Sequence, residues 1–235
     1  MRIFYLLFLA SALGCGKRDI APENTGKVSG TVRDQAGSTI PGVQIIVDNS
    51  IFFNSNLSTK TTPEGNYTLP LPKTGSWYAF AIHKIQFNGK IYQCYLHPQE
   101  PTGFGPEGAV RNFTWKLSGQ KAAPLTGNYG GTVTIDNFPG IYLETDKIKF
   151  TLTPQGNLID GSQGQILERY ATDGHQILDV PIGRYKITAR YNSQTLKLRR
   201  WNTEDSFATE LILDFEPQIP AQCDNCFKLE YNTKP

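Results

Sequence analysis

Long apolar runs are scarce in this 235-residue sequence. The most apolar segment spans residues 3–13, and it is much shorter than the roughly 20 residues that a membrane-spanning helix needs. It follows the basic Arg2 and fits the h-region of a secretory signal peptide. The sequence therefore predicts an export leader over residues 1–14 rather than a spanning helix.

Charge of one sign is also lacking. The 23 Lys and Arg residues nearly balance the 21 Asp and Glu residues, which leaves a formal net charge of +2. No basic run or stripe interrupts this balance, and Lys197–Arg200 alternates as a solvated strand face would. A chain without a concentrated positive field is poorly suited to nucleic acid. We expect no nucleic-acid partner.

Catalytic motifs are absent. The sequence has only three histidines, and it contains no H-E-x-x-H, G-x-S-x-G or phosphate-binding glycine loop. His97-Pro98-Gln99-Glu100 matches the H-x-x-E of zinc carboxypeptidases, but no alternation of helices and strands surrounds it to build such an enzyme. We interpret the match as chance. The sequence predicts no enzyme, no cofactor and no metal site.

The chain has four cysteines, and Cys15 directly follows the apolar segment. Ala12-Leu13-Gly14-Cys15 resembles a bacterial lipobox, with Ala12 in place of the usual Leu. This predicts lipidation of Cys15 and a polar tether over residues 15–26, and thus an outer-membrane lipoprotein that faces the periplasm or the surface. The alternative is cleavage by ordinary signal peptidase at Ala10-Ser11-Ala12.

Cys223 and Cys226 lie close together near the other end of the sequence. A disulfide is permitted in an exported protein, and it is the favoured interpretation of this pair. A redox role requires the first thiolate at a helix N-terminus, but residues 227–231 alternate like a strand. Zinc would need two further ligands. Whether Cys94 is free stays open.

Alternation of apolar and polar residues dominates the chain. Short segments of this kind, separated by turns such as Pro63-Glu64-Gly65-Asn66, predict strands of β-sandwiches. We expect an all-β fold with two tandem antiparallel sandwiches of the transthyretin type, over residues 27–118 and 129–235. Residues 119–128 read as the linker between them.

A family pattern lies between Val28 and Leu71. Val28-x-Gly30-x-Val32-x-Asp34-x-x-Gly37-x-x-Ile40-x-Gly42-Val43-x-Ile45, followed by Thr62-x-x-Gly65-x-Tyr67-x-Leu69, resembles the carboxypeptidase regulatory-like domain. The resemblance implies a carbohydrate-binding-like sandwich of the type found in surface proteins of Bacteroidota. It implies a module that stabilises, positions or binds, and it brings no catalytic set.

The second half echoes the first. Gly30-Thr31-Val32 recurs as Gly131-Thr132-Val133, and Gly65-Asn66-Tyr67 resembles Gly183-Arg184-Tyr185. A diverged internal repeat is one interpretation, and chance is the other. In the first half we expect Gly30 and Gly42 to stand where a side chain would clash or the backbone requires a positive φ.

Four aromatic residues depart from strand alternation and are candidate ligand contacts: Phe52, Phe53, Phe104 and Trp201. Loop aromatics on a rigid sandwich suit binding. The alternative is that they cover the sandwich ends. The function we expect is a non-enzymatic, lipid-anchored envelope protein that binds or positions a partner, either an envelope protein or a glycan. A carbohydrate-binding module is the first alternative, and an accessory to a zinc peptidase is the second.

Overall fold

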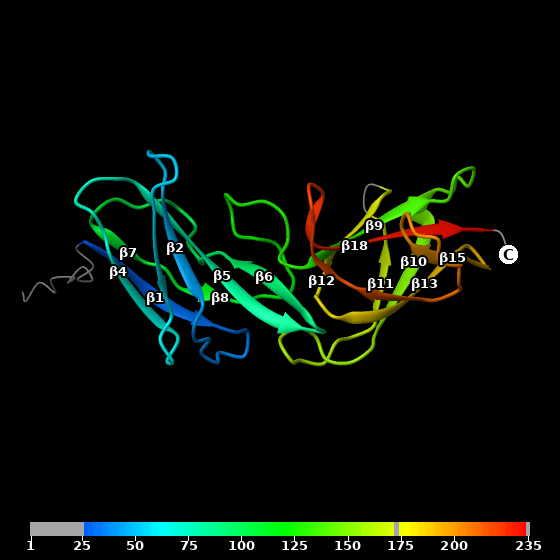
Figure 1. Cartoon of the computed structure of the whole chain (residues 1–235), viewed down its shortest axis with the longest axis horizontal. Coiled ribbons are helices and arrows are strands. Elements are labelled where there is room, and N and C mark those ends of the chain that lie inside the picture. Colours follow the sequence, from blue (N-terminus) through cyan, green and yellow to red (C-terminus); the bar gives the residue numbers. More distant parts are fainter. Residues whose placement is uncertain (1–25, 172–173, 234–235) are drawn as a thin grey trace, which may run out of the picture.

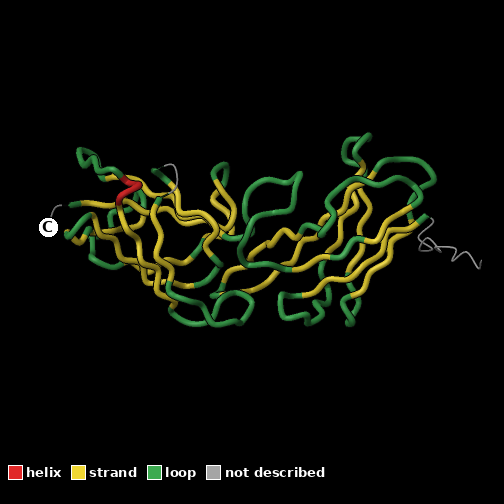
Figure 2. The backbone as a smooth tube through the Cα atoms, turned by 180° about the vertical axis from the view of Figure 1, so that it is seen from behind, coloured by secondary structure: helices red, strands yellow, loops and turns green. Residues whose placement is uncertain are grey.

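The computed structural model describes residues 26–171 and 174–233. The fold is all-β, because strands and loops make up the described chain except for a single 3-10 turn, η1 (Thr145–Lys147) (Figure 2). In these ranges no helix is long and apolar enough to cross a membrane. The predicted leader, Cys15 and the tether up to residue 25 lie outside the described residues.

The first sandwich consists of two sheets. One has the order β4-β1-β7, with β8 also pairing β1, and the other has the order β3-β2-β5-β6. Its strands are β1 (Lys27–Arg33), β2 (Gln44–Asn49), β3 (Asn56–Lys60), β4 (Asn66–Pro70), β5 (Trp77–Phe87), β6 (Lys90–Leu96), β7 (Gly108–Val110) and β8 (Phe113–Thr114).

The second sandwich also consists of two sheets. One has the order β12-β9-β18-β15, with β17 on β18, and the other has the order β11-β10-β13-β14, with β16 on β13. Its strands are β9 (Gly131–Asn137), β10 (Ile148–Pro154), β11 (Leu167–Tyr170), β12 (Gln176–Val180), β13 (Arg184–Tyr191), β14 (Gln194–Thr195), β15 (Lys197–Arg200), β16 (Leu211–Asp214), β17 (Glu216–Ile219) and β18 (Cys223–Asn232).

The two sandwiches share a strand plan. In each, the first strand pairs antiparallel with the fourth and parallel with the last: β1 with β4, β7 and β8, and β9 with β12 and β18. In each, the second strand lies between the third and the fifth. All other strand pairs are antiparallel.

A glycine marks the same point of both plans. A Cβ on Gly30 in β1 would lie 2.0 Å from the backbone oxygen of Arg111, and one on Gly131 in β9 would lie 2.5 Å from that of Asn225. Both oxygens belong to the segment that runs parallel to the first strand. The Gly-Thr-Val echo therefore falls on equivalent strands and has a steric cause.

The Gly-x-Tyr echo does not fall on equivalent strands. Tyr67 lies on β4, which pairs with β1, whereas Tyr185 lies on β13, which belongs to the opposite sheet. Their hydrogen bonds differ too, because the Tyr67 hydroxyl donates to Arg111 O and the Tyr185 hydroxyl to Pro181 O. This half of the proposed repeat is a chance likeness.

The cores follow the alternation seen in the sequence. On β2 and β5 the inward residues Ile45, Val47 and Ala81 are fully buried, while their neighbours along each strand face outward. On β10 the inward residues Ile148, Phe150 and Leu152 are equally buried. Period-two burial between facing sheets is what holds each sandwich together.

A long hairpin joins the sandwiches. β5 and β6 extend beyond the first sandwich and meet the second one near β17 in the middle of the elongated molecule (Figure 1). The Tyr92 hydroxyl donates to Phe215 O at 2.6 Å, and Lys90 Nζ lies 2.8 Å from a Glu216 carboxylate oxygen. Tyr92 is fully buried at this junction.

Candidate functional site

The loop between β2 and β3 carries three consecutive exposed apolar side chains. Ile51 and Phe52 expose 63% and 61% of their surface, and Phe53 is completely exposed. The loop projects from the first sandwich at the upper end of β2, above the label of that strand in Figure 1. Three consecutive large apolar residues in water are unusual for a loop and make it a candidate contact surface.

Hydrogen bonds hold this loop in shape. The buried Asn49 Oδ1 accepts the backbone N–H groups of Ile51 and Phe52 at 2.8 and 3.1 Å. This is the turn geometry that an Asn side chain favours. Asn49 N donates to Ser55 O at 3.0 Å and so closes the loop across its base. The Phe52 and Phe53 rings therefore project from an ordered turn.

A hollow of about 620 Å³ lies beside the loop. Its volume is within the range of small-ligand sites. Asp48, Asn49, Ser50, Ile51, Phe52, Phe53, Asn54, Asn56 and Tyr78 line it. The described lining thus combines three aromatic rings with amide and hydroxyl groups and one carboxylate, and it includes no basic residue.

Strand register places the polar floor of the hollow. Asp48 on β2 lies opposite Asn56 on β3 and opposite Tyr78 on β5. The Tyr78 hydroxyl donates to Asp48 Oδ2 at 2.6 Å, and this hydrogen bond raises the pKa of Tyr78. The other carboxylate oxygen accepts the N–H of Asn49 at 3.0 Å. Asp48 therefore orients the tyrosine ring and braces the loop.

The prediction for Phe104 is wrong. Its backbone pairs with Trp77 through two hydrogen bonds of 2.8 Å, and its ring is only 8% exposed. The Arg111 guanidinium lies 5.0 Å from the ring centroid. The glycine-rich segment around Phe104 folds back on β5 and so returns the ring to the core.

Trp201 belongs to the second sandwich and does not join Phe52 and Phe53. It follows β15 and exposes 37% of its surface. Its indole N–H donates to Asp136 Oδ2 at 3.0 Å, and Lys228 Nζ lies 4.7 Å from the ring centroid. These two contacts hold the ring against its own sheet, which leaves it one open face.

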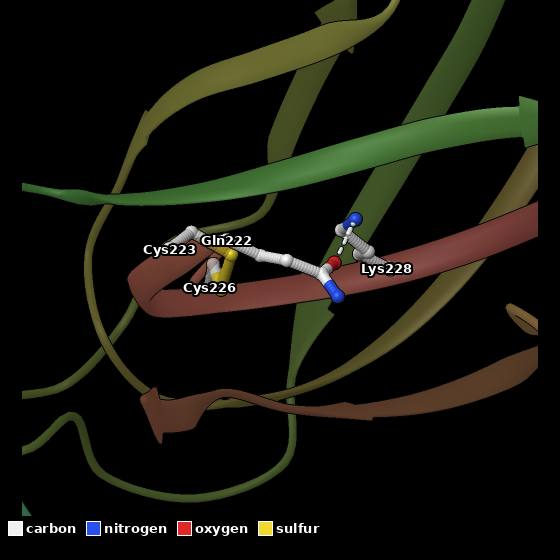
Figure 3. The surroundings of a disulfide bond; sticks show 4 residues. All are labelled: Gln222, Cys223, Cys226 and Lys228. Carbon is white, nitrogen blue, oxygen red and sulfur yellow. Dashed lines mark hydrogen bonds between the residues drawn. A yellow bond between two sulfur atoms is a disulfide. The ribbon is translucent and has the colours of Figure 1, made fainter. Parts of the chain in front are cut away.

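Cys223 and Cys226 are joined by a disulfide at the start of β18 (Figure 3). Lys228 on the same strand donates a hydrogen bond to the Gln222 side chain beside the bridge (Figure 3). β18 continues from the bridge as a strand, so neither cysteine lies at a helix N-terminus. Cys94 is free and buried, and this burial raises the pKa of its thiol to about 11.

His97 and Glu100, which match the zinc-carboxypeptidase motif, each lie near a side chain that is not a metal ligand. The His97 ring lies 6.4 Å from that of Tyr129, and burial lowers its pKa. Glu100 approaches Arg111 at 3.8 Å. In the described ranges no three His, Cys, Asp or Glu side chains are grouped so that they could hold a metal ion.

A second, smaller hollow of about 200 Å³ lies at the junction of the two sandwiches. It is lined by Cys94, Tyr95, Trp115, Lys116, Leu117, Lys121, Asn128, Tyr129, Gly130, Ile182, Asp224 and Asn225. Trp115 and Leu117 are core residues, and the Asn225 amide donates to Gln93 O at 3.2 Å. Asn225 thus links the second sandwich to β6, while Tyr95 lies exposed on the outer face of β6.

Comparisons with known proteins give only distant likenesses. No family model and no curated protein matches the chain, so its resemblance to the carboxypeptidase regulatory-like domain stays a prediction. The TIE protein of Bacillus anthracis is 10% identical at a TM-score of 0.34, over 87% of this chain and 34% of that protein. This chain thus spans about a third of that protein's length.

Two further structures match over most of their own length. The minor pilin GBS52 of Streptococcus agalactiae is 10% identical at a TM-score of 0.28, over 89% of this chain and 96% of the pilin. A B repeat unit of the collagen-binding surface protein of Staphylococcus aureus is 14% identical at a TM-score of 0.23, over 89% and 97%. Likenesses this weak assign no function.

Two members of the candidate site were not predicted from the sequence. Asp48 and Tyr78 stand 30 positions apart, and only the pairing of β2 with β5 brings them together. Tyr78 alternates with buried neighbours on β5 and therefore reads as an ordinary strand residue. The outward half of that alternation, read as a surface, is the signal that points to it.

Proposed function

We propose that this chain is a non-enzymatic, lipid-anchored envelope protein that binds a partner through the β2–β3 loop. The observation that carries the proposal is the row Ile51-Phe52-Phe53, exposed to water on a turn that Asn49 holds in place. Burying these side chains against a partner would recover roughly 25 cal/mol for each Å² of apolar surface. A fixed turn loses little conformational entropy on binding.

The anchor rests on Cys15 and the apolar leader before it. Labelling cells with a fatty-acid analogue should mark the wild-type chain and leave Cys15→Ser unmarked. If the Cys15→Ser chain is labelled equally, the lipid lies elsewhere and the anchor assignment falls.

Capture from an envelope extract tests the binding role. A chain of residues 16–235, which lacks both the apolar leader and Cys15, should retain its partner on a column, and Phe52→Ser with Phe53→Ser should lose it. Tyr142→Ser is the matched control, because Tyr142 is comparably exposed but lies on the second sandwich. Unchanged capture by the Phe52/Phe53 variant would reject the loop as the contact surface.

Carbohydrate binding is a second candidate, and the hollow beside the loop favours it. Sugars offer flat apolar faces to aromatic rings and hydroxyl groups to carboxylates and amides. The hollow supplies both kinds of group, with Tyr78 and Phe52 as rings and Asp48, Asn54 and Asn56 as polar partners. Calorimetric titration with neutral sugars tests this candidate directly. No comparable observation supports an accessory role to a zinc peptidase.

A further inference from the structure

The hollow beside the β2–β3 loop continues into a line of aromatic rings. Tyr78, Phe80 and Tyr95 occupy outward positions on β5 and β6. The ring centroids of Tyr78 and Phe80 are 6.3 Å apart with an interplanar angle of 22°, and those of Phe80 and Tyr95 are 6.5 Å apart. The three rings therefore form one track across the outer face of the sheet.

The track connects the two hollows. Tyr78 lines the hollow beside the loop, and Tyr95 lines the hollow at the junction of the sandwiches. Phe80 lies between them and is half-buried, with one side open. A ligand that follows the rings would touch both hollows.

Polar groups flank the two ends of the track, and Ile46 lies opposite Phe80 at its middle. In the register of the sheet, Tyr78 is opposite Asp48, and Ile82 is opposite both Gln44 and Tyr95. Gln93 is exposed on β6, one outward position from Tyr95. Stacking surfaces bordered by amides and a carboxylate suit a ligand with apolar ring faces and a rim of hydroxyl groups.

The charges at the loop end of the site disfavour a lipid surface. The junction hollow at the other end is lined by Lys116, Lys121 and Asp224 as well. Membrane-binding loops combine apolar tips with basic residues that meet anionic headgroups. The described lining of the loop hollow has Asp48 as its one charged side chain and has no Lys or Arg. If the apolar tip of the loop inserted into a membrane, the Asp48 carboxylate would approach the anionic headgroups and be repelled by them.

We infer that the outer face of the β3-β2-β5-β6 sheet binds an extended neutral glycan chain, with one end at the β2–β3 loop and the other at the junction near Tyr95. The inference rests on the proposed function of the loop and on carbohydrate as its second candidate, and it adds that the glycan is an extended neutral chain with a defined direction. One pyranose ring covers one aromatic ring, so three rings in line offer stacking to several successive sugars.

Chain length is the decisive variable. The chain of residues 16–235 is titrated calorimetrically with soluble starch, xylan, mannan and mixed-linkage β-glucan, and with disaccharides and hexasaccharides of whichever polymer binds. We expect the hexasaccharide to bind about tenfold more tightly than the disaccharide, because a disaccharide covers at most two of the three rings and the hexasaccharide reaches all of them. Equal affinities for the two lengths, or no binding of any polymer, would overturn the inference.

Variants at the two ends separate the track from the loop. Tyr95→Ala should remove most of the affinity that the hexasaccharide gains over the disaccharide and leave disaccharide binding at the loop end unchanged. Tyr95→Phe, which keeps the ring, should retain that gain. Tyr142→Ala, off the track, should change neither affinity. A Tyr95→Ala chain that keeps the full gain would refute the track even if the loop binds sugar.

The outcomes also distinguish this inference from the proposed function. Loss of envelope capture in the Phe52/Phe53 variant together with no glycan binding would leave the loop as a protein contact and reject the glycan. Sedimentation with vesicles of phosphatidylglycerol and phosphatidylethanolamine, dependent on Phe53, would instead identify the ligand as lipid and overturn the inference. We expect no such sedimentation.

Discussion

At the scale of single residues, Gly30 makes the sharpest demand on the fold. A Cβ at this position would lie 2.0 Å from the Arg111 backbone oxygen, which also accepts the Tyr67 hydroxyl. Gly30→Ala must therefore push two strands apart. We expect the free energy of unfolding, measured by urea titration, to fall by about 3 kcal/mol.

Gly37→Asn is the control for this substitution. Gly37 has a φ of +88°, a Cβ added to it would meet nothing within 4 Å, and Asn tolerates a positive φ. Gly37→Asn should lower the free energy of unfolding by about 1 kcal/mol or less. If the two variants lost similar amounts of unfolding free energy, the strands around Gly30 would be able to accommodate a Cβ, and the predicted steric role of Gly30 would be wrong.

Cys94 offers a residue-scale prediction about reactivity. Burial disfavours the charged thiolate and raises the pKa of this thiol to about 11, so almost none of it is ionised at pH 8. We expect a thiol-specific chromogenic reagent to react with the folded Cys15→Ser chain very slowly at pH 8, and with one thiol rapidly after addition of guanidinium. Rapid reaction without denaturant would show that Cys94 is accessible.

At the scale of elements, strand identity was predictable and strand extent was not. Alternation located the core of β2 and β5, because one face of each strand is buried. Alternation in the sequence suggests that β5 ends near Ile82, yet it runs to Phe87, because its far end is covered by the second sandwich. Covering by distant residues likewise buries Phe104, which local sequence reads as a loop aromatic.

The β5–β6 hairpin gives a prediction about one hydroxyl. The Tyr92 hydroxyl donates to Phe215 O across the junction, and burial raises the pKa of Tyr92 to about 12. Tyr92→Phe keeps the ring but leaves the Phe215 oxygen without this donor, so stability should fall by about 1–2 kcal/mol. Tyr142→Phe, at an exposed position, should change the urea midpoint negligibly, and an equal shift in both variants would contradict this role.

At the scale of the whole molecule, two sandwiches of like plan are joined by a hairpin and a short segment. Asp179 of the second sandwich accepts the backbone N–H groups of Gly119 and Gly130, which bracket the predicted linker. Lys90 adds an ion pair with Glu216 from the hairpin side. The glycan track ends at this junction, so the angle between the sandwiches also sets the shape of the far end of the proposed site.

The junction should couple the unfolding of the two halves. Domains joined only by a flexible linker unfold independently, whereas a packed interface makes them unfold together. We expect one calorimetric transition for the wild-type chain. Combining Lys90→Ala with Tyr92→Phe should split the single transition into two, because both the buried hydroxyl and the ion pair are lost. Small-angle scattering of this variant should show a broader distribution of interatomic distances. Two well-separated transitions in the wild type would show that the hairpin contacts contribute little, and the ligand track would then have to tolerate a moving end at Tyr95.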